Sequence, residues 1–90
     1  MFSKAPINFE RTSKEDIDKE ILRSAMIAEL DAINLYEEMA ALTYDENLKK
    51  ILLDVAREEK IHVAMFQTVL MEVDHEYLKV MAKYALTGNR

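Results

Sequence analysis

The sequence predicts an all-α fold, in which two long antiparallel helices form a hairpin and a short C-terminal helix follows. Three observations lead to this prediction. The chain of 90 residues contains one glycine and one proline, so little interrupts a helix. Apolar residues recur at helical spacing over residues 21–40 and again over residues 48–73. Apolar residues make up 50% of the chain and charged residues 32%, which is typical of a folded helical domain.

The chain divides into an N-terminal arm and one helical domain. Residues 1–12 contain the single proline and show no clear period, so we interpret them as an irregular or docking arm. Ser13 followed by Asp16 is a helix-capping pattern, and the helical period then continues to about Thr43. Residues 13–90 are therefore predicted to form a single helical-hairpin domain. The large apolar residues of the arm are Phe2, Ile7 and Phe9.

The second half of the chain predicts two further helices. Residues 43–46 are the expected connection, and Asp45 is placed to cap a second helix that ends near residue 73. Asp74 or a neighbour is expected to interrupt this helix. A third, shorter helix is expected over residues 76–86.

Ionisable residues interrupt both apolar stripes. Glu29 lies between apolar neighbours in the first helix, and Glu59 and His62 fill the gap between Val55 and Phe66 in the second. Burying such groups without partners would cost on the order of several kcal/mol. A cation is the simplest partner that suits both a carboxylate and an imidazole.

A hairpin brings these three residues to one height. Glu29 lies about fifteen residues before the turn and Glu59 about fifteen after it, and the rise per residue is equal in both helices. Glu59 and His62 are three positions apart, which puts their Cβ atoms about 5–6 Å apart on one face of a helix. The three side chains can therefore bind one metal ion or a close pair of ions.

Three ligands do not complete a metal site, and two helices do not bury their own apolar stripes. A second copy related by a two-fold axis remedies both, because it forms a four-helix bundle with four glutamates and two histidines at its centre. Hard oxygen donors dominate this set and no thiolate is present to favour zinc. The set is that of a carboxylate-bridged di-iron centre.

Composition narrows the classes of function. Seventeen acidic and twelve basic residues give a net charge of -5, which disfavours nucleic acid and anionic membranes as partners. The absence of cysteine excludes thiolate catalysis, iron-sulfur clusters and a rubredoxin-type iron centre. No apolar run reaches the length of a membrane span, and the first residues lack a signal-peptide core. We therefore expect a cytoplasmic protein with no nucleic-acid and no membrane partner.

Two segments, 27–36 and 54–62, resemble the ferritin-like superfamily. With its single, unduplicated motif set, the chain is similar in particular to the encapsulated ferritins, small iron oxidases associated with encapsulin shells. The resemblance covers about residues 13–86. It implies a ferritin-like four-helix bundle completed by dimerisation, and a homo-oligomer in which dimers form a ring, such as a decamer. It also implies an encapsulin shell protein as partner, with the chain inside the nanocompartment.

The resemblance implies a site and an activity as well. Glu29, Glu59 and His62 are implied as iron ligands and catalytic residues of one di-iron centre per dimer, with Glu59 as the bridging carboxylate. The implied activity is that of a ferroxidase, which oxidises Fe(II) to Fe(III) with dioxygen for iron storage inside the shell. Two Fe(II) ions held side by side can each supply one electron to dioxygen.

Two more residues have both a functional and a plain interpretation. Asp31 matches one acidic position of the family's metal-access site, but Ala28 stands at another, so Asp31 is either an access site or part of a polar face. Tyr36 is placed to hydrogen-bond around the centre or to quench a stray oxidant, and is otherwise a core tyrosine with a bonded hydroxyl. Four further ionisable residues are expected on the surface: Glu37, Glu38, Glu58 and His75.

Two alternative functions stay open at this stage. A rubrerythrin-like peroxidase would use a similar centre, but proteins of that type generally carry a rubredoxin centre and this chain has no cysteine. A non-enzymatic helical module would bind zinc structurally, or bind no metal and only dimerise or dock. Residues 86–90 do not resemble a shell-targeting peptide, so the chain is either part of a longer fusion or associates with a shell differently, if at all.

Overall fold

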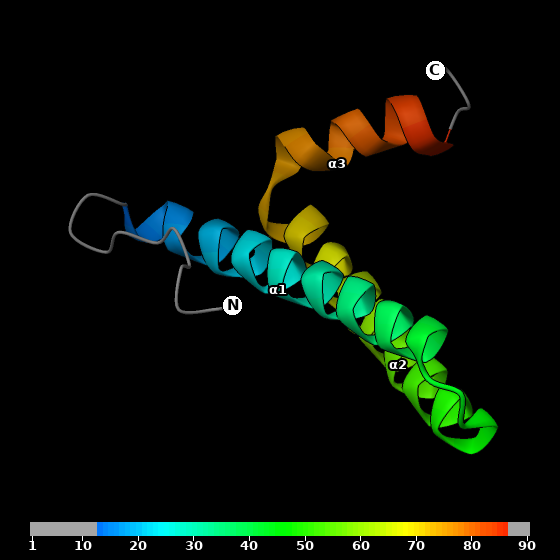
Figure 1. Cartoon of the computed structure of the whole chain (residues 1–90). Coiled ribbons are helices and arrows are strands. Elements are labelled where there is room, and N and C mark those ends of the chain that lie inside the picture. Colours follow the sequence, from blue (N-terminus) through cyan, green and yellow to red (C-terminus); the bar gives the residue numbers. More distant parts are fainter. Residues whose placement is uncertain (1–12, 87–90) are drawn as a thin grey trace.

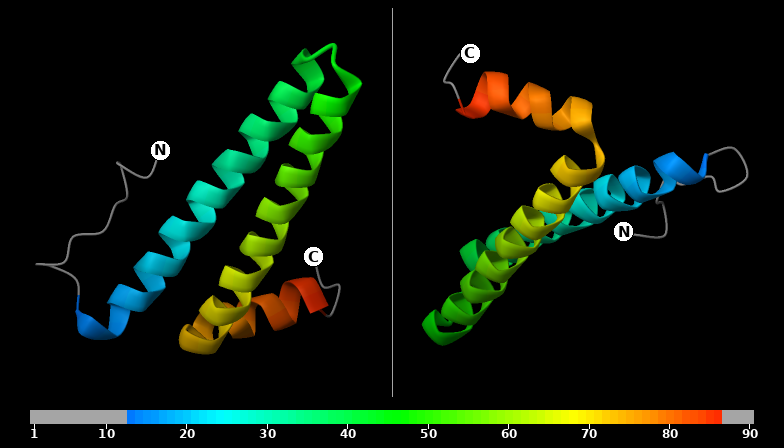
Figure 2. Two further views of the ribbon diagram at one scale, coloured as in Figure 1. Left: turned by 90° about the horizontal axis from the view of Figure 1, so that it is seen from below. Right: turned by 180° about the vertical axis from the view of Figure 1, so that it is seen from behind.

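The computed structural model describes residues 13–86, all of the regular structure of which is helical. Two long helices, α1 (Lys14–Leu42) and α2 (Glu46–Val73), pack side by side as an antiparallel hairpin (Figure 1). The short helix α3 (His75–Met81) continues as a π-helical segment, η2 (Ala82–Leu86). Figure 2 shows that α3 turns away from the axis of the hairpin. The predicted all-α fold is confirmed.

The connection between the long helices follows the predicted turn chemistry. The Asp45 carboxylate accepts hydrogen bonds from the backbone N–H groups of Asn47 and Leu48, at 2.9 and 3.1 Å. The Asp45 N–H in turn donates to the hydroxyl oxygen of Thr43. Because these bonds satisfy donors that the first turn of a helix leaves unpaired, they fix where α2 begins.

The start of α1 differs in detail from the prediction. Ser13 occupies the N-cap position, as expected, but its hydroxyl accepts no hydrogen bond from the first turn. It donates instead to the Asp16 carboxylate, at 2.8 Å. The sequence pattern therefore marks correctly where α1 begins, and the bond found there joins the two side chains.

The hairpin buries few apolar side chains, and on one of its sides ion pairs connect the two long helices. Among the described residues the buried apolar side chains are Leu22, Ala40, Ala56 and Leu70. Arg23 on α1 pairs with Asp74 at 3.1 Å, and Glu37 on α1 pairs with Lys60 on α2 at 2.7 Å. These pairs lie on one side of the hairpin.

The opposite side is apolar and open. Successive residues of an α-helix are about 100° apart, and on this basis five of the exposed large apolar side chains lie about 80–120° round their helices from Glu29 or Glu59, on the side away from the ion pairs. They are 42% to 59% exposed. Their exposure in the single chain agrees with the expectation that two helices do not bury their own apolar stripes. We call this surface the apolar face, and it consists of Ile21, Leu35, Ile51, Met65 and Val69.

Two further observations complete the fold. In the part of the chain that the structure describes, no helix is both long enough and apolar enough to cross a membrane. The predicted arm, residues 1–12, lies outside the described residues, so its boundary with the helical domain stays a prediction.

Candidate metal centre

The hairpin brings Glu29, Glu59 and His62 together at mid-height. Glu29 lies near the middle of α1, and the other two lie one turn apart near the middle of α2. The Nδ1 atom of His62 is 2.6 Å from Oε2 of Glu29 and 3.6 Å from Oε1 of Glu59. One candidate ligand atom from each residue lies within 4.8 Å of the other two. Among residues 13–86, no other group of three histidine, cysteine or acidic side chains has this geometry.

The two carboxylates are more enclosed than the imidazole. The side chains of Glu29 and Glu59 are 20% and 17% exposed, whereas that of His62 is 44% exposed. His62 lies toward the side of the hairpin that carries the apolar face, because it is about 60° round α2 from Glu59 in that direction. The group therefore opens toward the apolar face rather than toward the ion pairs.

Electrostatics at this group favour a cation. Burial, together with the negative charge of Glu29, raises the pKa of the Glu59 carboxyl above its ordinary value. Two carboxylates that repel each other in a partly buried position are stabilised when a positive ion binds between them. His62 relieves part of this repulsion in the metal-free chain.

The contact between His62 and Glu29 also has a consequence for metal binding. An ionised carboxylate only accepts hydrogen bonds, so beside an ionised Glu29 the Nδ1 atom of His62 has to be the donor in this contact. A nitrogen that carries a proton cannot bind a metal ion. Binding through Nδ1 therefore requires that this hydrogen bond break and the proton leave.

The donor set fits a hard or borderline divalent metal ion. Two carboxylates and one imidazole suit iron, whereas a structural zinc site usually uses four ligands with thiolate or several imidazoles. One chain provides three donor groups, so positions of the metal ion are left for further ligands or dioxygen.

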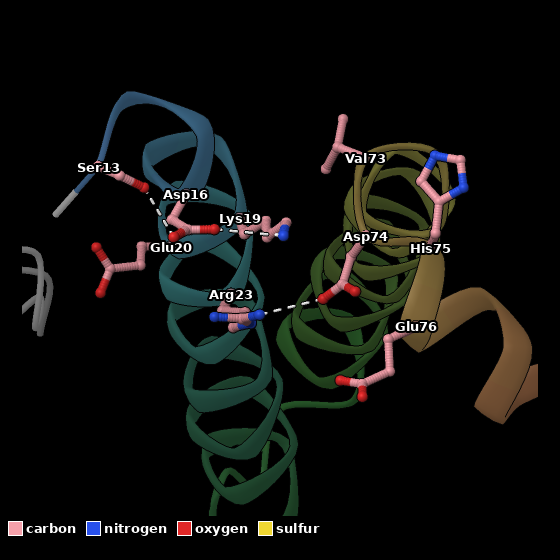
Figure 3. A pocket seen from close by; sticks show the side chains of 9 residues that line it. All are labelled: Ser13, Asp16, Lys19, Glu20, Arg23, Val73, Asp74, His75 and Glu76. Atoms are coloured by element: carbon pink, nitrogen blue, oxygen red, sulfur yellow. Dashed lines mark hydrogen bonds and ion pairs between the residues drawn. The ribbon is translucent and has the colours of Figure 1, made fainter.

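The other residues singled out in the sequence lie outside this group. Asp31 is exposed on α1 and lines a shallow hollow of about 270 Å³ together with Tyr36. Tyr36 is half-buried, two turns beyond Glu29. His75 is exposed, as expected, and lies beside Asp74 among the residues that line an open pocket at this end of the hairpin (Figure 3).

Two ion pairs across the hairpin were not anticipated from the sequence. Glu37 was expected to be a surface charge, and it forms an ion pair with Lys60 across the hairpin. Arg23 forms a second ion pair with Asp74. A signal for them was present in the spacing. Glu37 follows Arg23 by 14 residues and Lys60 precedes Asp74 by 14 residues, as a constant antiparallel register requires.

Fold and site together define a class of protein. An open helical hairpin that carries two partly buried glutamates and a histidine at mid-height has the arrangement of one half of a ferritin-like bundle. The profile of the family described as EncFtn-like matches residues 5–87, and the chain belongs to this family. The resemblance to the encapsulated ferritins is confirmed.

Similar proteins agree with this assignment. The chain is 62% identical over 64 residues to a ferritin-like-encapsulin shell fusion protein of Pyrococcus furiosus, covering 71% of this chain and 18% of that protein. It is 42% identical over 62 residues to the encapsulin nanocompartment cargo protein EncC of Myxococcus xanthus, covering 66% of this chain and 48% of that protein. The chain thus matches less than half the length of either relative.

A solved structure extends the likeness to the whole fold. The crystal structure of the encapsulated ferritin domain from Pyrococcus furiosus superposes with a TM-score of 0.75 at 49% sequence identity. The match covers 92% of this chain and 90% of that one. The two long helices and the short third one are therefore a shared architecture.

Proposed function

We propose that this protein is a ferroxidase, which oxidises Fe(II) to Fe(III) with dioxygen at a site shared by two chains. The observation that carries the proposal is the convergence of Glu29, Glu59 and His62, whose ligand atoms lie within 4.8 Å of one another. Membership of the EncFtn-like family supports iron as the metal. In this proposal iron is the substrate, and the three residues bind it.

The open apolar face supports a site shared by two chains. It carries five large side chains that are about half exposed, beside the imidazole of His62. Covering them on two chains would stabilise a dimer by roughly 10 kcal/mol before the cost of association is subtracted. The same two-fold contact brings a second set of two glutamates and one histidine to the centre.

The residues of this chain then have distinct roles. Glu29 and Glu59 supply negative charge, which favours Fe(III) over Fe(II), and Glu59 is the bridging carboxylate. His62 supplies an imidazole nitrogen, which at Nδ1 becomes accessible to the metal ion once the contact with Glu29 is broken. When two Fe(II) ions are bound side by side, each loses one electron and dioxygen gains both.

We further propose that the Fe(III) product is stored inside an encapsulin shell in the cytoplasm. The names of two relatives, a shell fusion and a cargo protein, support this setting. The chain would be fused to or packaged by the shell protein as a ring of dimers. Asp31 is proposed as an access site for iron, and Tyr36 as a hydrogen-bonding neighbour of the centre.

Stopped-flow absorbance after mixing metal-free protein with Fe(II) in air tests the activity. We expect Fe(III) to form faster than without protein, and the variants Glu29→Ala, Glu59→Ala and His62→Ala to reduce the rate to that of the protein-free control. Glu58→Ala is the matched control, because Glu58 is an exposed carboxylate beside the group and should keep the wild-type rate.

Two other results would replace the proposal. Rapid consumption of hydrogen peroxide without Fe(III) mineral would indicate a rubrerythrin-like peroxidase. Oxidation at the protein-free rate, combined with a melting temperature that zinc raises, would indicate a structural metal site.

A further inference from the structure

The side chain of Ser24 is buried although it does not face α2. It is 4% exposed. Ser24 lies five positions before Glu29, which places it about 140° round α1 from that residue, just beyond the apolar face. Ile21 and Ile27, three positions to either side of Ser24, are 44% and 61% exposed. Ser24 is therefore covered at a place where its neighbours are open.

Shielding by neighbours along the same helix does not account for this burial. Ala64 has a side chain of similar size and lies about 140° round α2 from Glu59. It is exposed. A small residue on the outer flank of one of these helices thus stays open when nothing lies on it, so a further segment covers Ser24.

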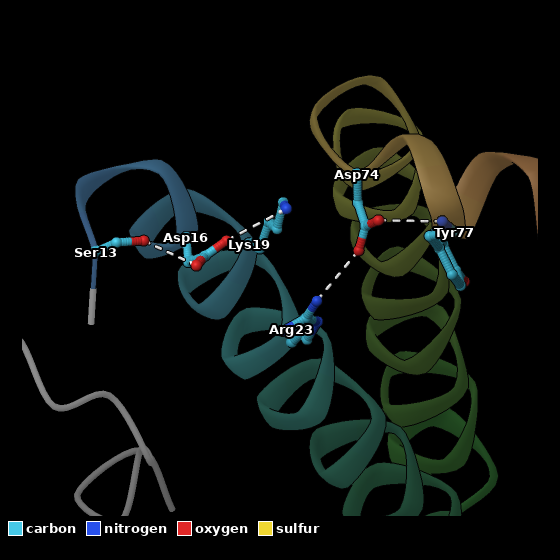
Figure 4. A network of polar contacts seen from close by, with 6 residues as sticks. All are labelled: Ser13, Asp16, Lys19, Arg23, Asp74 and Tyr77. Atoms are coloured by element: carbon cyan, nitrogen blue, oxygen red, sulfur yellow. Dashed lines mark hydrogen bonds and ion pairs between the residues drawn. The ribbon is translucent and has the colours of Figure 1, made fainter. Parts of the chain in front are cut away.

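The helix α3 lies elsewhere around α1. The Asp74 carboxylate accepts hydrogen bonds from the N–H of Tyr77 and from the guanidinium of Arg23, both at 3.1 Å (Figure 4). These bonds hold the start of α3 on the side of the ion pairs, and residues 87–90 follow from its far end. The segment that precedes α1 is then the part of the chain left to cover Ser24.

Residues 1–12, the N-terminal arm, are long enough to reach Ser24. They join α1 at Ser13, and Ser24 lies about 16 Å further along the helix. An extended chain covers this distance in about five residues. A reversal of direction over about four residues then places residues 5–9 on the flank that carries Ser24. This stretch contains Ile7 and Phe9, two of the large apolar residues of the arm.

The chemistry of the Ser24 side chain favours an extended segment over a helix of a second copy. Its hydroxyl is buried and has no hydrogen-bond partner in the described part of the chain. Burying a hydroxyl without a hydrogen bond is unfavourable. An extended segment brings backbone N–H and C=O groups that are not paired within it, whereas a helix pairs these groups internally.

We propose that the N-terminal arm folds back along α1 and docks over Ser24, with Ile7 and Phe9 against the flank between Ile21 and Ile27. The contact forms within one chain, and it depends neither on a metal ion nor on the proposed function. Because the arm lies on the outer flank of α1, the part of the apolar face on α2 stays open to a second copy.

The reactivity of a thiol at position 24 tests this contact. The chain has no cysteine, so Ser24→Cys introduces a single thiol in a side chain of nearly the same shape. In the full metal-free chain we expect it to react with a maleimide at least ten-fold more slowly than Glu38→Cys. Glu38 is a matched control, because it is exposed and lies on the same flank, about four turns further along. Equal rates for the two variants would overturn the proposal.

Substitutions in the arm distinguish it from a second copy as the cover. In the Ser24→Cys background, Ile7→Asp combined with Phe9→Asp should raise the reaction rate at least ten-fold, since charged side chains do not pack on an apolar flank. Before that change, protection of the thiol should be the same at all protein concentrations. A thiol that stays protected in the arm variant, or that dilution alone makes reactive, contradicts docking of the arm.

Limited digestion with trypsin tests the contact with Ser24 intact. The arm contains two trypsin sites, Lys4 and Arg11. A docked segment is cleaved when it opens locally, so the wild type should release arm peptides at least ten-fold more slowly than the Ile7→Asp, Phe9→Asp variant. Equal rates would show that the arm is not docked. None of these measurements uses iron, so this inference and the proposed ferroxidase activity can fail separately.

Discussion

Replacing Glu59 with glutamine should make the metal-free protein more stable while it removes metal binding. Glutamine keeps the shape of the side chain and removes the charge that Glu29 repels. Two unit charges within 4.8 Å of each other repel by about 1 kcal/mol in water and by about 3 kcal/mol at an effective dielectric constant of about 20. The contact of His62 with Glu59, at 3.6 Å, offsets part of this repulsion. We expect a net gain of about 1 kcal/mol, which raises the melting temperature of a domain of this size by about 4–8 °C.

The gain should depend on pH in a defined direction. Burial and the charge of Glu29 raise the pKa of Glu59 above its ordinary value of 4.5. The stability that Glu59 contributes is therefore fully present below the pKa of the unfolded chain and is lost as pH rises through the higher pKa of the folded state. The difference in melting temperature between Glu59→Gln and wild type should be small near pH 4 and largest at pH 7.

Thermal unfolding of the metal-free proteins, followed by circular dichroism across this pH range, measures the effect. Glu58→Gln is the control and should melt with the wild type. Anaerobic Fe(II) should raise the melting temperature of the wild type and of Glu58→Gln, but not that of Glu59→Gln. A Glu59→Gln variant that melts below the wild type at pH 7, or that Fe(II) stabilises equally, would refute the electrostatic account of the centre.

Three further predictions follow from the fold. Ile51→Glu places a charge on the apolar face, so native mass spectrometry should show separated chains and stopped-flow absorbance a loss of iron oxidation; a dimer that persists would contradict the shared site. Leu70 is 4% exposed, and urea unfolding of Leu70→Ala should show a loss of about 2–4 kcal/mol, whereas a loss near zero would mean that the core lies elsewhere. The hydrogen bond from the Tyr77 N–H, and after it the guanidinium of Arg23, hold the pKa of the Asp74 carboxyl below its ordinary value. The stability that Asp74 contributes is therefore present above the pKa that it has in the unfolded chain, and is lost as pH falls through its lower pKa in the folded chain. Lowering the pH should therefore reduce the free energy of unfolding of the wild type more than that of Asp74→Asn. An equal reduction in both proteins would argue against the bonds that Asp74 makes between α2 and α3.

Much of the hairpin is predictable because its signals are local. Asp45 caps α2 through atoms two and three residues away, and the scarcity of glycine and proline leaves both long helices uninterrupted. The convergence of Glu29 with Glu59 and His62 follows from a further rule, since equal distances from one turn bring residues to one height. Simple geometry therefore suffices to place the candidate site.

What the sequence could not predict depends on contacts between distant residues or between chains. A helical stripe does not distinguish the residues that face the other helix of the hairpin from those that stay exposed in a single chain, such as Ile21 and Ile51. The direction of α3 depends on a bond between Arg23 and Asp74, which are 51 residues apart. Neither residue by itself carries a local pattern that indicates this bond, and the equal spacing of the two ion pairs becomes a signal only once the register of the hairpin is known.

Diffraction at the iron absorption edge, from crystals grown anaerobically with Fe(II), tests the shared centre most directly. We predict two anomalous peaks on or near a two-fold axis between chains, with Glu29, Glu59 and His62 of both copies within bonding distance. A single ion held by one chain, or iron bound only at exposed carboxylates such as Asp31, would contradict the account.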